Sequence, residues 1–136
     1  MAIGIDTTIR NNRLQVIMDA LDAGVNAGYI EFYTGTRPAT GGALAGNTLL
    51  GTCTLSKPSG TIANGVFTFD TISDDQSADN DGTMTWCRFF DGDGTFVMDA
   101  SVGLSGSTAT VIATTVNIIT GGVIRVTSGS LTEGGA

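Results

Sequence analysis

The first regular pattern in the chain is a row of apolar residues with helical spacing at about residues 12–23. Its members are Leu14, Ile17, Met18 and Leu21. Intervals of three and four residues place side chains on one face of an α-helix. Asn11 or Asn12 is positioned to cap the start of this helix, and Gly24 to end it. The pattern predicts one short amphipathic helix, which must dock on another element because an isolated helix of this length is marginal in water.

Beyond residue 27 the pattern changes to short runs of β-branched and aromatic residues separated by Gly, Asn, Asp and Ser, which predict strands. The predicted strands are 29–33, 49–55, 66–71, 83–90, 95–101, 107–119 and 123–131. The connections at 35–47 and 72–82 are long enough to cross between two sheets. We therefore expect a mainly β protein, a single-domain β-sandwich or jelly roll of about seven or eight strands with one short N-terminal helix.

Alternation of apolar and polar residues indicates which side chains of the strands face the core. Around Trp86 the alternation places Met84 and Trp86 on one face, opposite Cys87. The aromatic residues expected in the core are Phe32, Phe67, Phe69, Trp86 and Phe96.

The last two predicted strands carry small, polar and β-branched residues on both faces and almost no charge. A long strand of this kind at a sheet edge promotes aggregation unless another chain covers it. We therefore expect the protein to associate with itself as a dimer or trimer, with Val123 and Arg125 at an interface.

The expected organisation is an N-terminal arm at 1–10 followed by a β-sandwich domain at 11–136. Within the arm, Ile3 and Ile5 alternate with small or polar residues, as in a short strand. A segment of this kind can add to the sheet edge of a neighbouring subunit through backbone hydrogen bonds. We therefore also expect Ile3 and Ile5 at an interface.

Composition argues against several classes of function. The 136 residues include 6 Lys and Arg against 13 Asp and Glu, so the formal net charge is −7, and neither nucleic acid nor a membrane surface is an expected partner. The chain contains no histidine, which is the most frequent general base and metal ligand. Cys53 and Cys87 are too few for a disulfide framework and are expected to be buried thiols.

Two acidic stretches have the spacing of calcium ligands. Their candidate ligands are Asp79, Asp81, Asp91 and Asp93. Each stretch ends in Gly, as at the start of an EF-hand loop, but the last loop position holds Phe90 or Val102 rather than Glu. Asp-Gly pairs are also common in β-hairpin turns. We favour the turn interpretation over a metal site, and we expect no cofactor.

No group of residues indicates an enzyme. The many Ser and Thr residues have no histidine to activate them, and Lys57 lies in a turn. A glycosidase needs two carboxylates across a cleft, and no pattern brings Glu31, Asp70 or Asp99 into such a pair. We expect a non-enzymatic protein.

Short motifs follow one another over most of the chain. They are Arg13-Leu14 in the predicted helix, Ile30-Glu-Phe-Tyr-Thr-Gly-Thr-Arg-Pro-Ala-Thr40, Leu49-Leu-Gly-Thr52, Ser77-Ala-Asp-Asn-Asp-Gly-Thr-Met-Thr-Trp86, Asp93-Gly-Thr95, Asp99-Ala-Ser-Val-Gly103 and Gly121-Gly-Val-Ile-Arg-Val-Thr-Ser128. In this order they resemble a family of small proteins encoded by tailed bacteriophages. The resemblance implies a structural role in the virion, and it supplies no catalytic or ligand residues.

Small all-β phage proteins of this size are often capsid decoration, or cement, proteins, which bridge neighbouring capsomers as oligomers. By this analogy the chain is made in the bacterial cytoplasm, lies on the capsid surface and has the major capsid protein as its partner. The alternative is a tail- or fibre-associated module that binds carbohydrate or another receptor through Tyr29, Tyr33 or the loop at 72–82.

Overall fold

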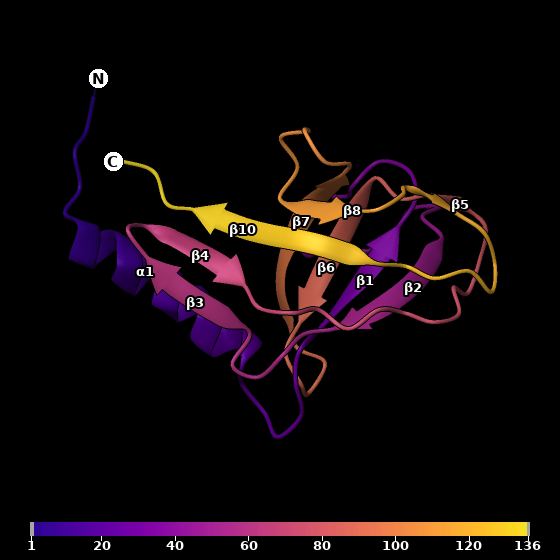
Figure 1. Ribbon diagram of the computed structural model, residues 1–136, viewed down its shortest axis with the longest axis horizontal. Helices are drawn as coiled ribbons and strands as arrows, with labels where there is room; N and C mark the ends of the chain where they lie inside the picture. Colours follow the sequence, from indigo (N-terminus) through magenta and orange to yellow (C-terminus); the bar gives the residue numbers. More distant parts are fainter. Residues whose placement is uncertain (1, 136) are drawn as a thin grey trace.

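The computed structural model describes residues 2–135, which form one mainly β domain with one α-helix (Figure 1). The helix, α1, spans Thr7–Leu21. The strands are β1 (Tyr29–Tyr33), β2 (Leu49–Thr54), β3 (Gly60–Ala63), β4 (Val66–Phe69), β5 (Gly82–Thr83), β6 (Trp86–Phe90), β7 (Phe96–Gly103), β8 (Val111–Ala113), β9 (Asn117–Ile118) and β10 (Val126–Thr132). The predicted fold class, a single-domain β-sandwich-like protein with one short helix, is confirmed.

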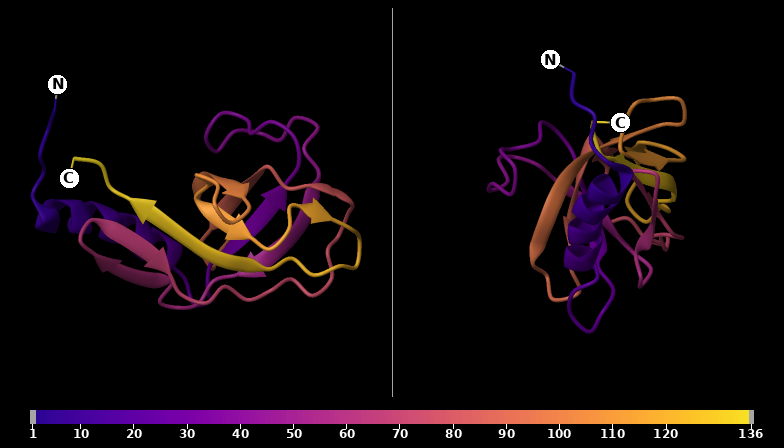
Figure 2. Two further views of the ribbon diagram at one scale, coloured as in Figure 1. Left: turned by 45° about the horizontal axis from the view of Figure 1, so that its top comes forward. Right: turned by 90° about the vertical axis from the view of Figure 1, so that its left-hand side faces the viewer.

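Eight of the strands form one curled sheet in the order β2-β1-β6-β7-β8-β10-β4-β3, while β5 and β9 form a small separate sheet. Neighbours in the large sheet are antiparallel except β7 and β8, which are parallel. The molecule is elongated (Figures 1 and 2): α1 and the β3–β4 hairpin lie at one end, β1, β2 and β5 lie at the other, and β10 runs between them.

Aromatic side chains join the two halves of the curled sheet. Phe69 of β4 stacks on Phe89 of β6, with ring centroids 5.3 Å apart, although these strands are not neighbours in the sheet. Phe67 packs against Phe69 from the same strand at 4.6 Å. The largest fully buried side chains are those of Trp86, Phe32, Phe67, Phe89, Leu14, Leu21, Ile30 and Leu50. Their removal from water provides the main stabilising free energy of the fold.

Helix α1 begins at Thr7 rather than near residue 12 and is capped by Asp6 rather than by an asparagine. A carboxylate oxygen of Asp6 accepts a hydrogen bond from the backbone N–H of Thr8 at 2.9 Å. Residues 7–9 of the first helical turn are exposed and its buried residue, Arg10, is charged, so the apolar pattern could not reveal this turn. Among the described residues only 2–6 precede the helix, which makes the non-helical arm shorter than the expected segment 1–10.

The rest of the helix follows its predicted pattern. Leu14 and Leu21 are buried, and Ile17 and Met18 pack partly against the core. Asp22 caps the end of the helix, and Gly24 lies in the turn beyond it. The predicted apolar face therefore docks on the sheet, mainly over β3 and β4.

Strand β3 was missed by the sequence analysis, although the turn that follows it carries a clear signal. Asn64 and Gly65 have φ values of 53° and 74°. A two-residue turn with positive φ at both positions is the type I′ hairpin turn, for which Asn-Gly is the preferred sequence. The helix is anchored on this turn, because Oδ1 of Asn11 accepts a hydrogen bond from the N–H of Gly65 at 2.7 Å.

The long strand predicted at 107–119 is wrong, whereas the strand predicted at 123–131 corresponds to β10, which begins three residues later and ends one residue later. The first is divided into β8 and β9 by a turn in which the N–H of Asn117 donates to Oγ1 of Thr115 at 3.1 Å. Strands β8 and β10 lie inside the sheet, whose edges are β2 and β3. Neither strand is an edge of the sheet along its whole length, so a long uncovered edge no longer argues for self-association, which stays a prediction.

The aromatic core is largely as predicted. Phe32, Phe67 and Phe69 belong to the main core, which is a confirmation. Trp86 is buried outside that core, and Phe96 is only half-buried. Both lie on the opposite face of the sheet, beneath a covering loop described below.

Trp86 and Cys87 lie on the opposite faces from those predicted, whereas Met84 is in the core as predicted. Cys87 and Phe89 point into the main core, whereas the Trp86 ring stacks on Tyr33 with centroids 4.7 Å apart. Pairing is interrupted between β5 and β6, so Met84 and Cys87 both reach the core even though strict alternation would separate them. The predicted alternation failed because it assumed one continuous strand.

Candidate functional site

The large sheet opens between β4 and β10. Their ladder ends at the pair Thr68 and Ser130, and the two segments meet again only at the isolated bridge between Asp75 and Ile124. The opening between these points, called the β4–β10 cleft, is lined by Phe69, Asp70, Thr71, Ile72, Val126, Thr127, Ser128 and Gly129. The cleft is thus a local failure of strand pairing within an otherwise continuous sheet.

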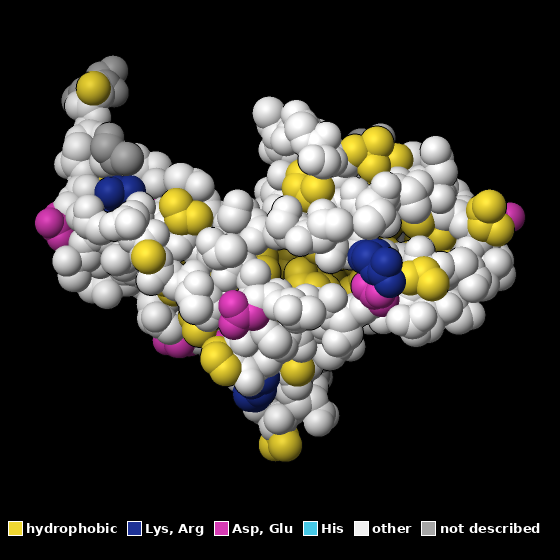
Figure 3. All heavy atoms as spheres, in the orientation of Figure 1, with side chains coloured by type: hydrophobic (Ala, Val, Ile, Leu, Met, Phe, Trp, Pro, Cys, Tyr) yellow, Lys and Arg dark blue, Asp and Glu magenta, His cyan; other side chains and the backbone are white. Residues whose placement is uncertain are grey.

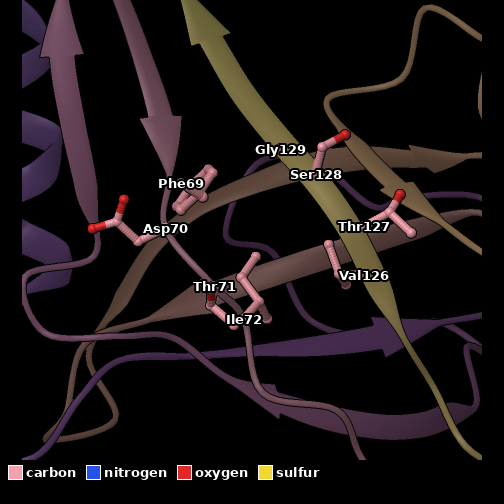
Figure 4. Close-up of a pocket in the computed structure, with 8 residues that line it drawn as sticks. All are labelled: Phe69, Asp70, Thr71, Ile72, Val126, Thr127, Ser128 and Gly129. Carbon is pink, nitrogen blue, oxygen red and sulfur yellow. The ribbon is translucent and has the colours of Figure 1, made fainter.

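The β4–β10 cleft has an apolar floor and a polar rim. Figure 4 shows Phe69, Ile72 and Val126 gathered at its centre, with the carboxylate of Asp70 pointing away from them. In Figure 3 hydrophobic side chains are visible at the bottom of a hollow in the middle of this face. The volume is about 260 Å³, just below the usual range of small-molecule sites. A cleft of this size fits one or two side chains better than a large ligand.

All six Lys and Arg side chains are held by groups of the same chain. The ion pairs are Arg13–Glu133 at 2.8 Å, Arg88–Asp99 at 2.7 Å, Arg125–Asp74 at 2.7 Å and Arg37–Asp99 at 3.9 Å. Arg10 and Lys57 donate instead to the backbone carbonyl oxygens of Ile5 and Gly24. Across residues 2–135 the other carboxylates form no ion pair, so the surface presents uncompensated negative charge.

Large apolar side chains are exposed at both ends of the elongated molecule. At the α1 end, Ile3 is 57% and Ile9 is 52% exposed. At the end that carries β9, Ile119 is 72% and Val123 is 41% exposed. The other exposed large apolar residues are Val16, Val25, Leu44 and Leu104. Single exposed apolar residues are normal, and these two pairs lie toward opposite ends of the molecule.

The structure separates the four residues that were predicted at interfaces. Ile3 is exposed, whereas Ile5 is half-buried and its N–H donates to the carbonyl oxygen of Gly135 at 2.6 Å. Val123 and Arg125 lie in the segment between β9 and β10, and Arg125 is exposed and pairs with Asp74. The arm and the 123–125 segment therefore belong to different surfaces.

Residues 34–48, called the strap loop, cover the outer face of β6 and β7. Beneath it, Asp99 accepts hydrogen bonds from Nε and Nη2 of Arg88 at 2.7 and 3.1 Å. The strap loop joins this pair twice: the N–H of Gly41 donates to Asp99 at 2.9 Å, and Nη1 of Arg88 donates to the carbonyl oxygen of Gly42 at 3.0 Å. The ion pair thus fastens the loop to the sheet.

The surroundings of this pair favour its charged form. Burial raises the pKa of the Asp99 carboxyl. Hydrogen bonds from Arg88 and Gly41, together with the charges of Arg88 and Arg37, lower this pKa by more than burial raises it, so the net pKa is below its usual value. The guanidinium of Arg88 lies between the rings of Trp86 and Phe96, 5.2 and 5.3 Å from their centroids. Both charges are enclosed and fully partnered, which indicates a structural role.

The structure places the two candidate carbohydrate-stacking tyrosines in different environments. Tyr33 is buried, stacks on Trp86 and donates a hydrogen bond to Glu31. Tyr29 is half-buried and stacks on Phe90 at 5.0 Å. Tyr33 therefore offers no free ring face to a sugar.

Of the four candidate metal ligands, Asp91 and Asp81 accept hydrogen bonds from other residues of the chain, and Asp79 and Asp93 lie in the same two loops. Oδ1 of Asp91 accepts hydrogen bonds from the N–H groups of Asp93 and Thr95 at 2.9 and 2.8 Å, which closes the β6–β7 hairpin. Asp81 binds the N–H and hydroxyl of Thr120 at 2.6 and 2.9 Å, and these bonds lower its pKa. In the part of the chain that the structure covers, no three His, Cys, Asp or Glu side chains are grouped to hold a metal ion.

Both cysteines are buried free thiols, as predicted. Burial raises the pKa of Cys53 to about 12, and it also raises the pKa of Cys87. Between residues 2 and 135 the structure has no helix that is long and apolar enough to cross a membrane.

The β4–β10 cleft and the Arg88–Asp99 pair were both missed by the sequence analysis. For the pair a signal existed, because Arg88 interrupts an aromatic strand and Asp99 lies in the next one. For the cleft no signal existed, since it depends on where two distant segments stop pairing.

In comparisons with known proteins, no family model matches the chain, and neither a curated protein nor a solved structure is significantly similar to it.

Proposed function

We propose that the chain is a non-enzymatic structural protein of a tailed-bacteriophage virion, a decoration protein that bridges neighbouring major capsid protein subunits on the head surface. The observation that carries this proposal is the exposure of large apolar side chains at both ends of an elongated domain. A protein that bridges two capsid subunits needs two contact surfaces on one rigid body. Ile3 and Ile9 supply one, and Ile119 and Val123 supply the other.

The charge distribution is consistent with this role. Because every Lys and Arg side chain is already held within the chain, the remaining carboxylates favour a basic partner surface and oppose contact with DNA. Each end surface is small, so a single contact is weak. Repetition of weak contacts over an icosahedral shell, and within a dimer or trimer, would provide the affinity through multivalency.

The proposal is tested by sedimentation with purified virion parts. Heads that lack the protein and isolated tails are each mixed with the purified chain and pelleted. We expect the chain to pellet with heads at a regular number of copies per capsid protein, and not with tails. Pelleting with tails alone, or binding to a glycan array without binding to heads, would show instead that the chain is a receptor-binding module.

A further inference from the structure

We propose that the β4–β10 cleft binds an extended, basic segment of the major capsid protein as an added strand along β10. This inference rests on the proposed function for the identity of the partner. The binding mode itself follows from the geometry and charge of the cleft.

The first argument is the unpaired edge of β10. One edge of this strand pairs with β8 at Val126, Ser128 and Gly129. Its other edge pairs with β4 only from Ser130 to Thr132, so at 126–129 the structure assigns it no strand partner. Free backbone donors and acceptors at such an edge are satisfied by an extended peptide, while side-chain pockets provide specificity.

The second argument is that the opposite side of the cleft cannot close by itself. The segment after β4 is tied elsewhere: the N–H of Asp70 donates to the carbonyl oxygen of Ser59 at 3.0 Å, and the N–H of Ser73 to that of Thr54 at 2.8 Å. These bonds hold residues 70–73 away from β10. The opening is therefore built into the fold, and closing it would break existing hydrogen bonds.

The third argument is the match between the cleft floor and one apolar side chain. Phe69, Ile72 and Val126 are nearly buried but form the bottom of the opening. The Phe69 ring fills the space beside Gly129, where a side chain would stand, so the ring is fixed against β10 as part of the floor. An extended segment alternates its side chains, and one apolar residue that points inward would cover this floor.

The fourth argument is charge. Asp70 is exposed at one end of the cleft and forms no ion pair with any described residue, and at the other end Asp74 is paired with Arg125. Acidic side chains are visible on both sides of the hollow in Figure 3. A Lys or Arg beside the apolar residue would pair with Asp70. A second copy of this chain is disfavoured as the occupant, because it also carries a charge of −7 and its arm, at residues 2–5, has no basic residue.

The test uses an array of overlapping twelve-residue peptides that covers the major capsid protein of the phage encoding the chain. The array also contains a copy of each peptide with Lys and Arg replaced by Glu, and peptides from residues 2–13 of this chain. The full-length labelled protein is the probe. We expect binding to one or a few basic capsid peptides with alternating apolar residues, and loss of that binding in their Glu copies.

Variants locate the binding site. Asp70→Lys is expected to weaken peptide binding at least tenfold, whereas Asp19→Lys on exposed α1, which changes the net charge equally, should weaken it less than threefold. A photo-reactive benzoylphenylalanine in place of Ser128 should cross-link the bound peptide. The same group in place of Thr61, on β3, should not.

The outcomes separate the cleft from the proposed function. Equal weakening by Asp70→Lys and Asp19→Lys, binding only of this chain's own peptides, or no peptide binding by a protein that does occupy heads would each overturn the cleft proposal. Specific peptide binding at Ser128 by a protein that does not sediment with heads would support the cleft and refute the decoration role.

Discussion

Arg88 and Asp99 form a buried ion pair across β6 and β7, on the face of the sheet that lies away from the main core. The Asp99 side chain is fully buried and receives two hydrogen bonds from the guanidinium. The same two residues bind the backbone of Gly41 and Gly42. The pair therefore links the β6–β7 hairpin to the strap loop, which is distant from it in sequence.

Replacing one partner of this pair should destabilise the protein strongly. Asp99→Asn leaves the Arg88 charge buried without a counter-ion, and breaking a buried pair in this way typically costs about 3–5 kcal/mol of unfolding free energy. The double variant Arg88→Met, Asp99→Leu removes both charges and should recover most of that loss. It should not recover all of it, because the two strap-loop hydrogen bonds are also lost. Urea denaturation of the single and double variants measures these differences, and a double variant no more stable than Asp99→Asn would contradict the account.

The same pair predicts loss of stability in acid. The Asp99 pKa is lower in the folded than in the unfolded protein, so near and below the unfolded value the unfolded state binds more protons. The stability that Asp99 contributes is therefore present above its unfolded pKa and is lost as pH falls through the folded pKa. Between pH 6 and pH 2.5 the urea midpoint of the wild type should fall by more than that of Asp99→Asn. An equal decrease in the two proteins would show that other carboxylates cause the acid sensitivity.

The sequence predicted well those elements that are determined by residues close together in the chain, and it predicted poorly those that depend on other interactions. Strand β1 matches its prediction at both ends, because alternation within five residues was enough to define it. Strand β3 was within reach too, since the Asn64-Gly65 turn that determines it is a local signal. In contrast, the division of the segment at 107–119 depends on side chain-to-backbone hydrogen bonds, which apolar patterns do not record.

The candidate surfaces were less predictable for the same reason. The sequence predicted Ile3 and Val123 at interfaces from their local pattern; both are exposed, and an interface at either residue stays a prediction. The β4–β10 cleft arises where Thr68 and Ser130 form the last pair of a ladder between strands far apart in the chain. The position of that last pair depends on the whole sheet, so no short motif could reveal it.

Cys53 and Cys87 should be unreactive in the folded protein. Both are fully buried and burial raises their pKa values, so at neutral pH they are protonated and inaccessible. With a thiol reagent such as dithionitrobenzoate we expect negligible reaction under native conditions and two thiols per chain in 6 M guanidinium chloride. Rapid modification of either thiol in the native protein would show that the core opens locally.

The apolar surface near β9 should be required for bridging. Ile119→Ser combined with Val123→Ser removes exposed side chains, so the folded domain should keep its thermal stability. Heads decorated with this variant should melt at a lower temperature than heads decorated with the wild type. Leu104→Ser is the matched control, because Leu104 is also exposed and apolar but lies in the loop after β7. An equal effect of the control would mean that this end of the molecule has no special role.

The N-terminal arm should be required for head binding but not for folding. Deleting residues 2–5 removes Ile3, the contact between Ile5 and Gly135 and the Ile5 carbonyl oxygen that binds Arg10. It keeps Asp6, whose side chain caps α1, and Thr7, whose hydroxyl also accepts a hydrogen bond from Arg10. A longer deletion of residues 2–9 would also remove the cap and most of the first helical turn. A loss of head binding could then result from a less stable domain rather than from the missing arm. The circular dichroism spectrum of the shorter deletion should be nearly native, and its occupancy on heads should fall at least tenfold.

Asp6→Ala is the matched control for the arm deletion, because it lowers stability without removing the arm. Losing a helix N-cap typically costs about 0.5–2 kcal/mol of unfolding free energy. This variant keeps all of the arm, so it should be less stable than the wild type and yet occupy heads normally. If the deletion of residues 2–5 unfolds the domain, the arm is part of the core through its contact with the C-terminal segment. If the deletion binds heads as the wild type does, the contact surface at this end is formed by α1, where Ile9 and Val16 are exposed, and not by the arm.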